Sequence, residues 1–180
     1  YRNLYVYGET AHSMGSGFAT SNGIIGSLSP KLTAIVHYRN YRRNYHHFFA
    51  QSMGELATLG NEKGVYGGVI YHPSRRIEWV NYLDMFSFPW VRFRAHAPTS
   101  GLDFLSQMSY IWHKKGRLVF RYRQRLKQEN ASIPSRNEPI LADLWRHQGR
   151  IDFQYKLQEQ WGIRSRLEVS SYSKEFENHQ

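Results

Sequence analysis

Residues 116–128 alternate regularly between apolar and polar side chains. A period of two is typical of an extended strand, because successive side chains point to opposite faces. In a soluble sandwich the apolar face would turn inward, whereas in a membrane barrel it would meet lipid and the cations would line a wet interior. The apolar face comprises Leu118, Phe120, Tyr122 and Leu126, and the opposite face comprises Val119, Arg121, Arg123, Arg125 and Lys127.

Eight further segments show the same alternation, so the pattern predicts nine strands of about ten residues. No segment with a helical period competes with them, although 45–59 could form a short helix. A transmembrane β-strand needs roughly 9 to 11 residues at its tilt, which these lengths match. The predicted strands are 3–12, 18–28, 32–41, 64–72, 76–88, 102–113, 116–128, 145–158 and 163–173.

The predicted connections alternate between short and long, as in outer-membrane barrels with tight periplasmic turns and long outer loops. Among the connections on the side of the long loops, only 13–17 is short. The short turns are 29–31, 73–75, 113–116 and 159–162, and the long loops are 42–63, 89–101 and 129–144.

The five tryptophans fall at the predicted strand ends. Trp79, Trp112 and Trp161 lie beside short turns, and Trp90 and Trp145 lie beside long loops. Aromatic girdles at both interfaces are typical of membrane barrels. We therefore predict that these residues mark the two membrane interfaces.

Composition narrows the alternatives. Aromatic residues make up 16% of the chain, yet the mean hydropathy is -0.64, which fits a barrel with a polar interior. No run approaches the roughly 18 to 20 apolar residues of a transmembrane helix. The absence of cysteine excludes disulfides, thiolate catalysis and cysteine-based zinc sites.

Together these patterns predict an all-β fold, an antiparallel up-and-down transmembrane β-barrel occupying 1–180 as a single domain in a bacterial outer membrane. A charge on the lipid face would cost about 2 to 4 kcal/mol at the midplane, which explains the strict alternation. Nine strands is an odd number, the last segment, ENHQ, is polar, and the sequence starts at Tyr1 without an initiator methionine. We expect part of a larger even-stranded barrel; the alternative is an eight- or ten-stranded barrel whose strands are miscounted.

Four stretches within 32–130 carry a resemblance to a known group of proteins. They read YRNYRRNYHHFFAQSMGE, NEKGVYGGVIYHP, WVNYLDMFSFPWVRFRAHAPTSG and VFRYRQRLKQEN, and the FPW…APTSG loop is the most specific of them. The sequence resembles the β-barrel region of Bacteroidota outer-membrane proteins that often carry helix-hairpin-helix segments elsewhere. The resemblance implies the fold and the location. It implies no DNA binding, because nothing here matches the helix-hairpin-helix.

The charge balance suggests an anionic partner, although a solvated basic surface would give the same balance. There are 24 Lys and Arg against 14 Asp and Glu, a formal net charge of +10. In a barrel the cations would form a basic wall that selects anions, or a ladder that pairs with carboxylates such as Asp152 and Glu168. The predicted wall comprises Arg121, Arg123, Arg125, Lys127, Lys156, Arg164 and Arg166.

The sequence contains only weak signals for a catalytic or a metal-binding site. His46 and His47 are adjacent, and no second ligand pair stands at a zinc spacing, so we expect no metal and no cofactor. Glu78 and Asp84 share one face of a predicted strand, and His96 lies in the loop that follows this strand. The GxSxG motif that marks a serine nucleophile is not present. We interpret the carboxylates as part of a hydrogen-bond network and expect no enzymatic activity.

The leading hypothesis is a channel or transport barrel with a positive lumen, whose partners are the lipid bilayer, lipopolysaccharide and an anionic solute. The alternative is a structural or assembly subunit that binds outer-membrane proteins or lipoproteins through its long loops. Loop contacts would then be Phe48, Phe49, Trp90 and Phe93. Nucleic-acid binding through 121–125 is disfavoured, because a binding surface would not need so uniformly apolar an opposite face.

Overall fold

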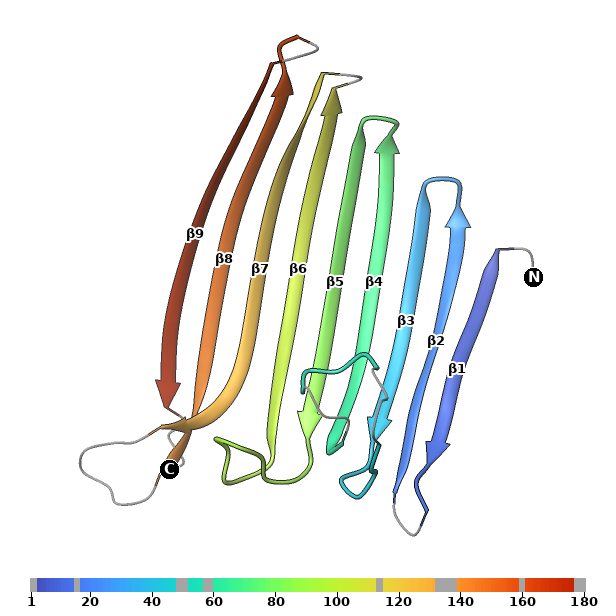
Figure 1. Ribbon diagram of the computed structural model, residues 1–180, viewed down its shortest axis with the longest axis vertical. Helices are drawn as coiled ribbons and strands as arrows, with labels where there is room; N and C mark the ends of the chain where they lie inside the picture. The colour runs from blue at the N-terminus through green and yellow to red at the C-terminus, as the bar shows by residue number, and fades with distance from the viewer. Residues whose placement is uncertain are drawn as a thin grey trace.

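The computed structural model describes residues 3–14, 17–47, 52–56, 60–112, 115–131, 139–158 and 161–176. The described residues form nine antiparallel strands in one sheet, and each strand pairs with its neighbours in sequence (Figure 1). The strands are β1 (Leu4–His12), β2 (Phe18–Ser29), β3 (Leu32–Tyr41), β4 (Glu62–Ser74), β5 (Ile77–Phe88), β6 (Thr99–Trp112), β7 (Gly116–Ala131), β8 (Ile140–Lys156) and β9 (Gly162–Phe176).

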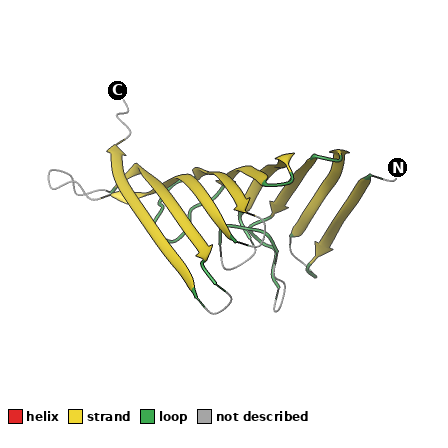
Figure 2. Ribbon diagram, turned by 90° about the horizontal axis from the view of Figure 1, so that it is seen from above, coloured by secondary structure: helices red, strands yellow, loops and turns green. Residues whose placement is uncertain are grey.

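The sheet is open. β1 and β9 are its two edges, and they lie on opposite sides of the molecule (Figure 1). Seen from above, the described strands form one continuous, twisted layer (Figure 2). The prediction of nine antiparallel up-and-down strands is therefore confirmed, while closure into a barrel stays a prediction.

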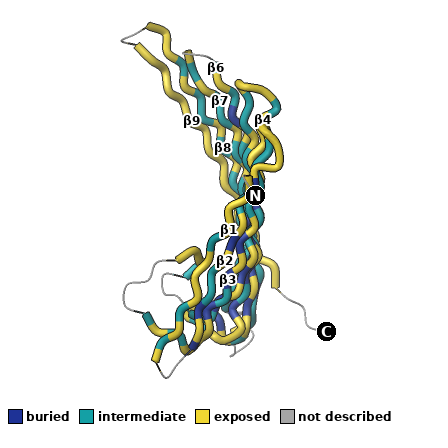
Figure 3. Tube along the Cα trace, turned by 90° about the vertical axis from the view of Figure 1, so that its right-hand side faces the viewer, coloured by how far each residue is buried: buried dark blue, intermediate teal, exposed yellow. Residues whose placement is uncertain are grey.

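The two faces of the sheet differ as the alternation predicts. On the apolar face, Val36 is 57% exposed, Phe120 41% and Leu167 62%. On the opposite face, Arg39 is 0% and Asp103 3% exposed. Buried residues gather mainly at the end of the sheet where the long connections lie (Figure 3). The largest fully buried side chains of the described residues, Arg39, Glu62 and Ser109, are thus polar, the reverse of a soluble sandwich.

The long connections are shorter than predicted. β6 begins at Thr99, and β7 and β8 pair as far as Ala131 and Ile140. The predicted bounds of the loop 129–144 are therefore wrong, because 129–131 belong to β7 and 140–144 belong to β8. Neither stretch alternates between apolar and polar residues, because 129–131 begin with two polar residues and 140–142 are three adjacent apolar ones, so the sequence pattern does not detect them.

The connection 42–61 between β3 and β4 is not helical where it is described. Residues 45–47 and 52–56 lack helical structure, and the remainder of the predicted helix 45–59 lies outside the described residues. Asn61 ends the connection at a φ of 55°. Its side chain exchanges two hydrogen bonds of 2.8 Å with the backbone of Trp90, which ties this connection to the one after β5.

A search for helices long and apolar enough to cross a membrane finds none among the described residues.

Candidate functional site on the charged face of the sheet

We use the term charged face for the side of the sheet that carries the predicted basic wall. The strand register places Arg125 opposite Asp103, and Asp103 opposite Asp84, so carboxylates of β5 and β6 share this face with the cations of β7. All seven predicted wall residues lie on it. Two separate groups of side chains divide the face, one near the long connections and one near the short turns.

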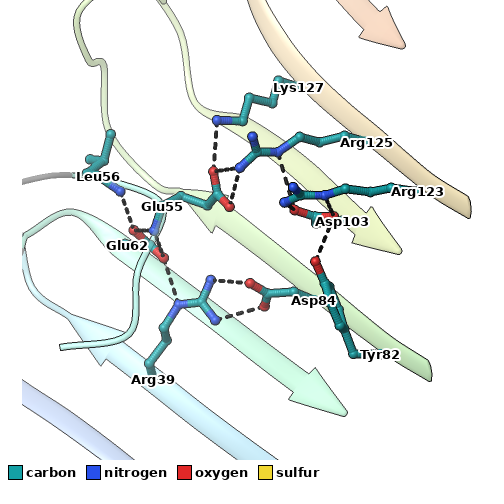
Figure 4. A network of polar contacts seen from close by, with 10 residues as sticks. All are labelled: Arg39, Glu55, Leu56, Glu62, Tyr82, Asp84, Asp103, Arg123, Arg125 and Lys127. Carbon is teal, nitrogen blue, oxygen red and sulfur yellow. Dashed lines mark hydrogen bonds and ion pairs between the residues drawn. The ribbon is translucent and has the colours of Figure 1, made fainter. Parts of the chain in front are cut away.

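The first group, the loop-end network, comprises Arg39, Glu55, Glu62, Asp84, Asp103, Arg123, Arg125 and Lys127 (Figure 4). Arg39 lies at its base on β3 and is fully buried. Its Nε donates to Glu62 at 2.6 Å, and its two Nη atoms donate to Asp84 at 2.8 and 3.1 Å. Gly64, opposite Arg39 on β4, makes room for the guanidinium, because a Cβ there would lie 2.5 Å from Arg39 Cζ.

Asp103 holds the middle of the loop-end network. It accepts a 2.9 Å hydrogen bond from Arg123 Nε and a second bond from Arg123 Nη2, and Arg125 Nε lies 3.4 Å away. Asp103 and Asp84 are direct register partners, an arrangement that would destabilise the strand pair if both stayed uncompensated. Arg39 binds one of these carboxylates and Arg123 binds the other.

Glu55 brings the connection 42–61 onto the charged face. Its carboxylate accepts hydrogen bonds of 2.7 and 2.8 Å from Arg125 and lies 2.8 Å from Lys127 Nζ. Burial alone would raise the pKa of Glu55, but Lys127 and Arg125 outweigh it and hold the pKa below its usual value. The backbone N–H groups of Glu55 and Leu56 donate to the Glu62 carboxylate, which fixes the same segment a second time.

The loop-end network carries no net formal charge, because its four cations face four carboxylates (Figure 4). Over Arg123, Arg125 and Lys127 the ladder hypothesis therefore describes the geometry better than a free positive wall. The sequence pattern could not pair these cations with their acids. Glu55 is 70 residues away from Arg125, and Asp103 is 20 residues away from Arg123.

The second group, the turn-end cluster, spans three strands at the other end of the charged face. Its register gives three rows, each with one residue from β7, β8 and β9 in that order. The rows are Arg117–Gln154–Arg164, Val119–Asp152–Arg166 and Arg121–Arg150–Glu168. Five arginines and two carboxylates in these rows leave a net charge of +3. Cations are in excess here, in contrast to the loop-end network.

Some arginines of the turn-end cluster find carboxylates and others do not. Arg150 Nε donates to Glu168 at 2.9 Å, and Arg166 Nε pairs with Asp152. Arg121 donates through Nε alone, to the amide oxygen of Gln107 at 2.8 Å.

Arg117 and Arg164 are also weakly neutralised. Arg117 Nη2 donates to Ser109 at 3.0 Å, and the nearest carboxylate oxygen, from Glu78, is 3.7 Å away. The side chain of Arg164 forms no hydrogen bond or close ion pair with any residue that the structure describes, although its charge interacts with that of Asp152.

A cavity of about 170 Å³ opens among these side chains. Of the predicted wall, it brings together Arg121, Arg164 and Arg166, whereas Lys156 does not line it. Arg117 lines it as well and was missed by the sequence analysis, although it shares the parity of the row 119–127. The lining also includes Asp152 and Gln154.

The tryptophans lie near both ends of the sheet. Trp79 is the third residue of β5 and Trp112 is the last of β6, both beside short turns, while Trp161 directly precedes β9 and Trp90 follows β5. Trp145 is not at a strand end, because β8 begins at Ile140. Trp145 pairs with Leu126 of β7. The pairing of β7 with β6 ends one residue further, at Lys127, whereas the pairing of β7 with β8 continues to Ala131. Trp145 therefore lies near the level at which the pairing of β7 with β6 ends.

The residues considered for catalysis do not converge. Asp84 binds Arg39, Glu78 faces His72 at 3.4 Å, and His96 Nδ1 lies 2.6 Å from the side-chain oxygen of Asn130. Among the described residues, no three His, Asp or Glu side chains are grouped to hold a metal ion. Of the loop aromatics, Phe93 is 86% exposed and Trp90 stacks under Arg43, while Phe48 and Phe49 lie outside the described residues.

No protein-family model, curated protein or solved structure matches the chain.

Proposed function

We propose that this sheet is a wall of a bacterial outer-membrane β-barrel that passes anionic solutes. Its apolar face would meet lipid and its charged face would line a polar interior. One observation carries the proposal: large apolar side chains stay exposed on one face of the sheet, while charged side chains are buried on the other.

The exposure of apolar side chains and the burial of charged ones have a physical reason in a membrane. A soluble monomer rarely exposes a contiguous apolar patch of more than a few hundred Å², whereas lipid favours such a surface. The exposed apolar residues run from Val6 on β1 to Val169 on β9. Barrel closure would pair the free edges of β1 and β9 with each other or with further strands, removing the unpaired backbone groups that lipid cannot satisfy.

The proposed solute preference follows from the uneven charge of the inner face. The loop-end network is neutral and holds the connection 42–61 across the face, which would narrow that end of the lumen. The turn-end cluster keeps an excess of arginines, and a ring of positive charge favours anions. We therefore attribute selectivity to the turn end.

A second candidate function is a structural or assembly barrel with a blocked interior. The loop-end network favours it, because Glu55 and Glu62 anchor a long connection on the face that would line the lumen. In this case the exposed loop residues, such as Phe93, would bind other envelope proteins.

The first experiment tests the barrel itself. The chain is expressed with a signal sequence in a Gram-negative host, and its membrane fraction and its migration on a gel before and after boiling are compared. A folded barrel would sit in the outer membrane and migrate faster unboiled. A chain that is soluble without detergent would overturn the proposal, because the apolar face would then need a protein partner.

Bilayer recordings separate the two candidates. The reversal potential of the current is measured under a salt gradient. For the transport barrel we expect its sign to show that anions pass more readily than cations. A protein that inserts but does not conduct would favour the structural barrel. Cation preference would contradict the role given to the turn-end cluster.

A further inference from the structure

We infer that the turn-end cluster is a binding site for a phosphate-bearing anion. The inference deepens the proposed function, and it rests on that proposal for the polar interior onto which the charged face opens. The cavity of about 170 Å³ supplies the space, several times the roughly 30 Å³ that one water molecule occupies in the liquid. Four arginines and one aspartate among its lining residues give it a net charge of +3.

The strand register surrounds the cavity with guanidinium groups. Arg117 and Arg164 belong to one row and are separated by β8, so their backbones lie roughly 10 Å apart at the usual strand spacing. Arg121 lies four residues along β7 from Arg117, on the same face. Long side chains on opposite sides of such a gap can converge on a group between them. Arg117 has an ion pair of 3.7 Å with Glu78, and Arg121 and Arg164 have none with a carboxylate of the described residues.

Many donors of these arginines remain available. A guanidinium has five N–H donors, and Arg121 uses only Nε in its bond to Gln107. Arg164 uses none with the described residues. The acid of the cavity is already engaged, because Asp152 binds Arg166. The surplus of donors is therefore matched by no acceptor that the described chain supplies.

A repulsion within the cluster points to the same conclusion. Arg121 and Arg150 are direct register partners on β7 and β8, and like charges in this position destabilise a strand pair. Glu168 compensates Arg150, but Arg121 has only a neutral amide. At the loop end the comparable pair, Asp84 and Asp103, is compensated by arginines of the chain itself. An external anion would do the same for Arg121.

Phosphate fits this arrangement better than a small monovalent anion. The planar guanidinium fork matches the oxygens of phosphate in pairs, and several forks around one group favour a multiply charged, tetrahedral ligand. The net charge of +3 would be largely balanced by a phosphate monoester. Free phosphate and the headgroup of an anionic phospholipid share this chemistry.

The test measures phosphate binding to the full chain, refolded in a phosphate-free nonionic detergent. Inorganic phosphate is titrated in ³¹P NMR and in calorimetry, with acetate at equal ionic strength as the comparison anion. A short-chain phosphatidic acid forms a second arm that distinguishes a lipid headgroup from free phosphate. Binding in detergent requires no conductance, so this test can fail while the barrel stands, and it can succeed on a barrel that does not conduct.

Three variants decide the outcome. Arg164→Gln removes a guanidinium that makes no hydrogen bond with the described residues, so folding should be little affected, and Arg121→Gln is a second, independent variant. Arg75→Gln is the control, because Arg75 is an exposed arginine in the turn between β4 and β5 and its loss changes the net charge equally. We expect Arg164→Gln and Arg121→Gln each to weaken phosphate binding about tenfold, and the control to leave it unchanged.

Saturable binding of phosphate over acetate with this pattern of variants would support the site. If only the phosphatidic acid bound, with the same dependence on Arg164, the ligand would be a lipid headgroup and the site would stand. Absence of saturable binding in both arms would overturn the inference. So would an equal loss in Arg75→Gln, because the effect would then come from overall charge.

Discussion

The contact between Glu55 and the β7 cations offers the sharpest test of how the connection 42–61 is held. Glu55→Gln keeps the size of the side chain but removes its charge. Arg125 and Lys127 would lose the carboxylate that both now share at 2.7 and 2.8 Å. The backbone hydrogen bonds to Glu62 would remain, so the variant weakens one of two anchors.

The expected size of the effect follows from burial. The side chain of Glu55 is 11% exposed, while those of Arg125 and Lys127 are 28% and 32% exposed. Breaking a fully buried ion pair costs about 3 to 5 kcal/mol, and an exposed pair is worth less than about 1 kcal/mol. For this partly exposed group we expect a loss of about 1 to 3 kcal/mol, which makes detachment of the connection about 5- to 150-fold more frequent.

The same contact predicts a pH dependence. The pKa of Glu55 is lower when the connection is attached than when it is free, so the attached state favours the ionised carboxylate. This contribution is fully present above the ordinary pKa of a glutamate. It is lost as the pH falls through the lowered pKa of the attached state. Acid should therefore release the connection in the native protein but have little further effect on Glu55→Gln.

Hydrogen exchange followed by mass spectrometry measures this directly in peptides that cover 52–56. The amides of Glu55 and Leu56 donate to Glu62 only while the segment is attached. Glu9→Gln is the matched control, because Glu9 is an exposed carboxylate on β1. Unchanged exchange of 52–56 in Glu55→Gln would refute the anchoring role, as would an equal acceleration in Glu9→Gln.

Three further predictions concern the sheet. Gly64→Ala should lower the temperature at which heat-modifiability is lost, because its Cβ would meet a buried guanidinium, whereas Gly67→Ala, with nothing within 4 Å, should not. Asp103→Asn should cost about 1 to 3 kcal/mol in urea unfolding, since it removes the charge of the acceptor that the partly exposed Arg123 and Arg125 share, and an unchanged midpoint would contradict the network. Val169→Lys on the apolar face should lose about 2 to 4 kcal/mol and most of the outer-membrane yield, whereas Ser170→Lys on the charged face should be tolerated; equal yields would exclude the lipid-facing assignment.

The strands and their faces were predictable because alternation is a local property. The side chains of Leu118 and Arg121 must point to opposite faces of any strand that contains them, whatever that strand pairs with. The ends of β7 and β8 were not predictable in this way. Their last pairs, such as Asn130 with Leu141, follow from continuing the register of the hairpin and not from an apolar pattern.

The loop-end network lay beyond the sequence pattern for a different reason. The position of Arg39 on the charged face could be predicted, but its partners could not, because Glu62 and Asp84 come from two other strands. Whether a row of cations is free or paired depends on which carboxylates the sheet brings across, and periodicity contains no information on that pairing. The excess charge at the turn end was therefore visible in the sequence only as part of a longer basic wall.

The division of the charged face supports an external ligand at the turn end. Where the chain places Asp84 opposite Asp103 at the loop end, it also supplies the opposite charges, through Arg39 and Arg123. Arg146, opposite Arg125, has the ring of Tyr172 at 5.1 Å in place of a carboxylate among the described residues. At the turn end, among the described residues, the side chain of Arg121 binds only an amide and that of Arg164 makes no hydrogen bond, although both line one cavity. Because the arginines of the loop-end network are each bound by a carboxylate of the chain, we attribute the missing counter-charge at this cavity to an anion that comes from outside the chain.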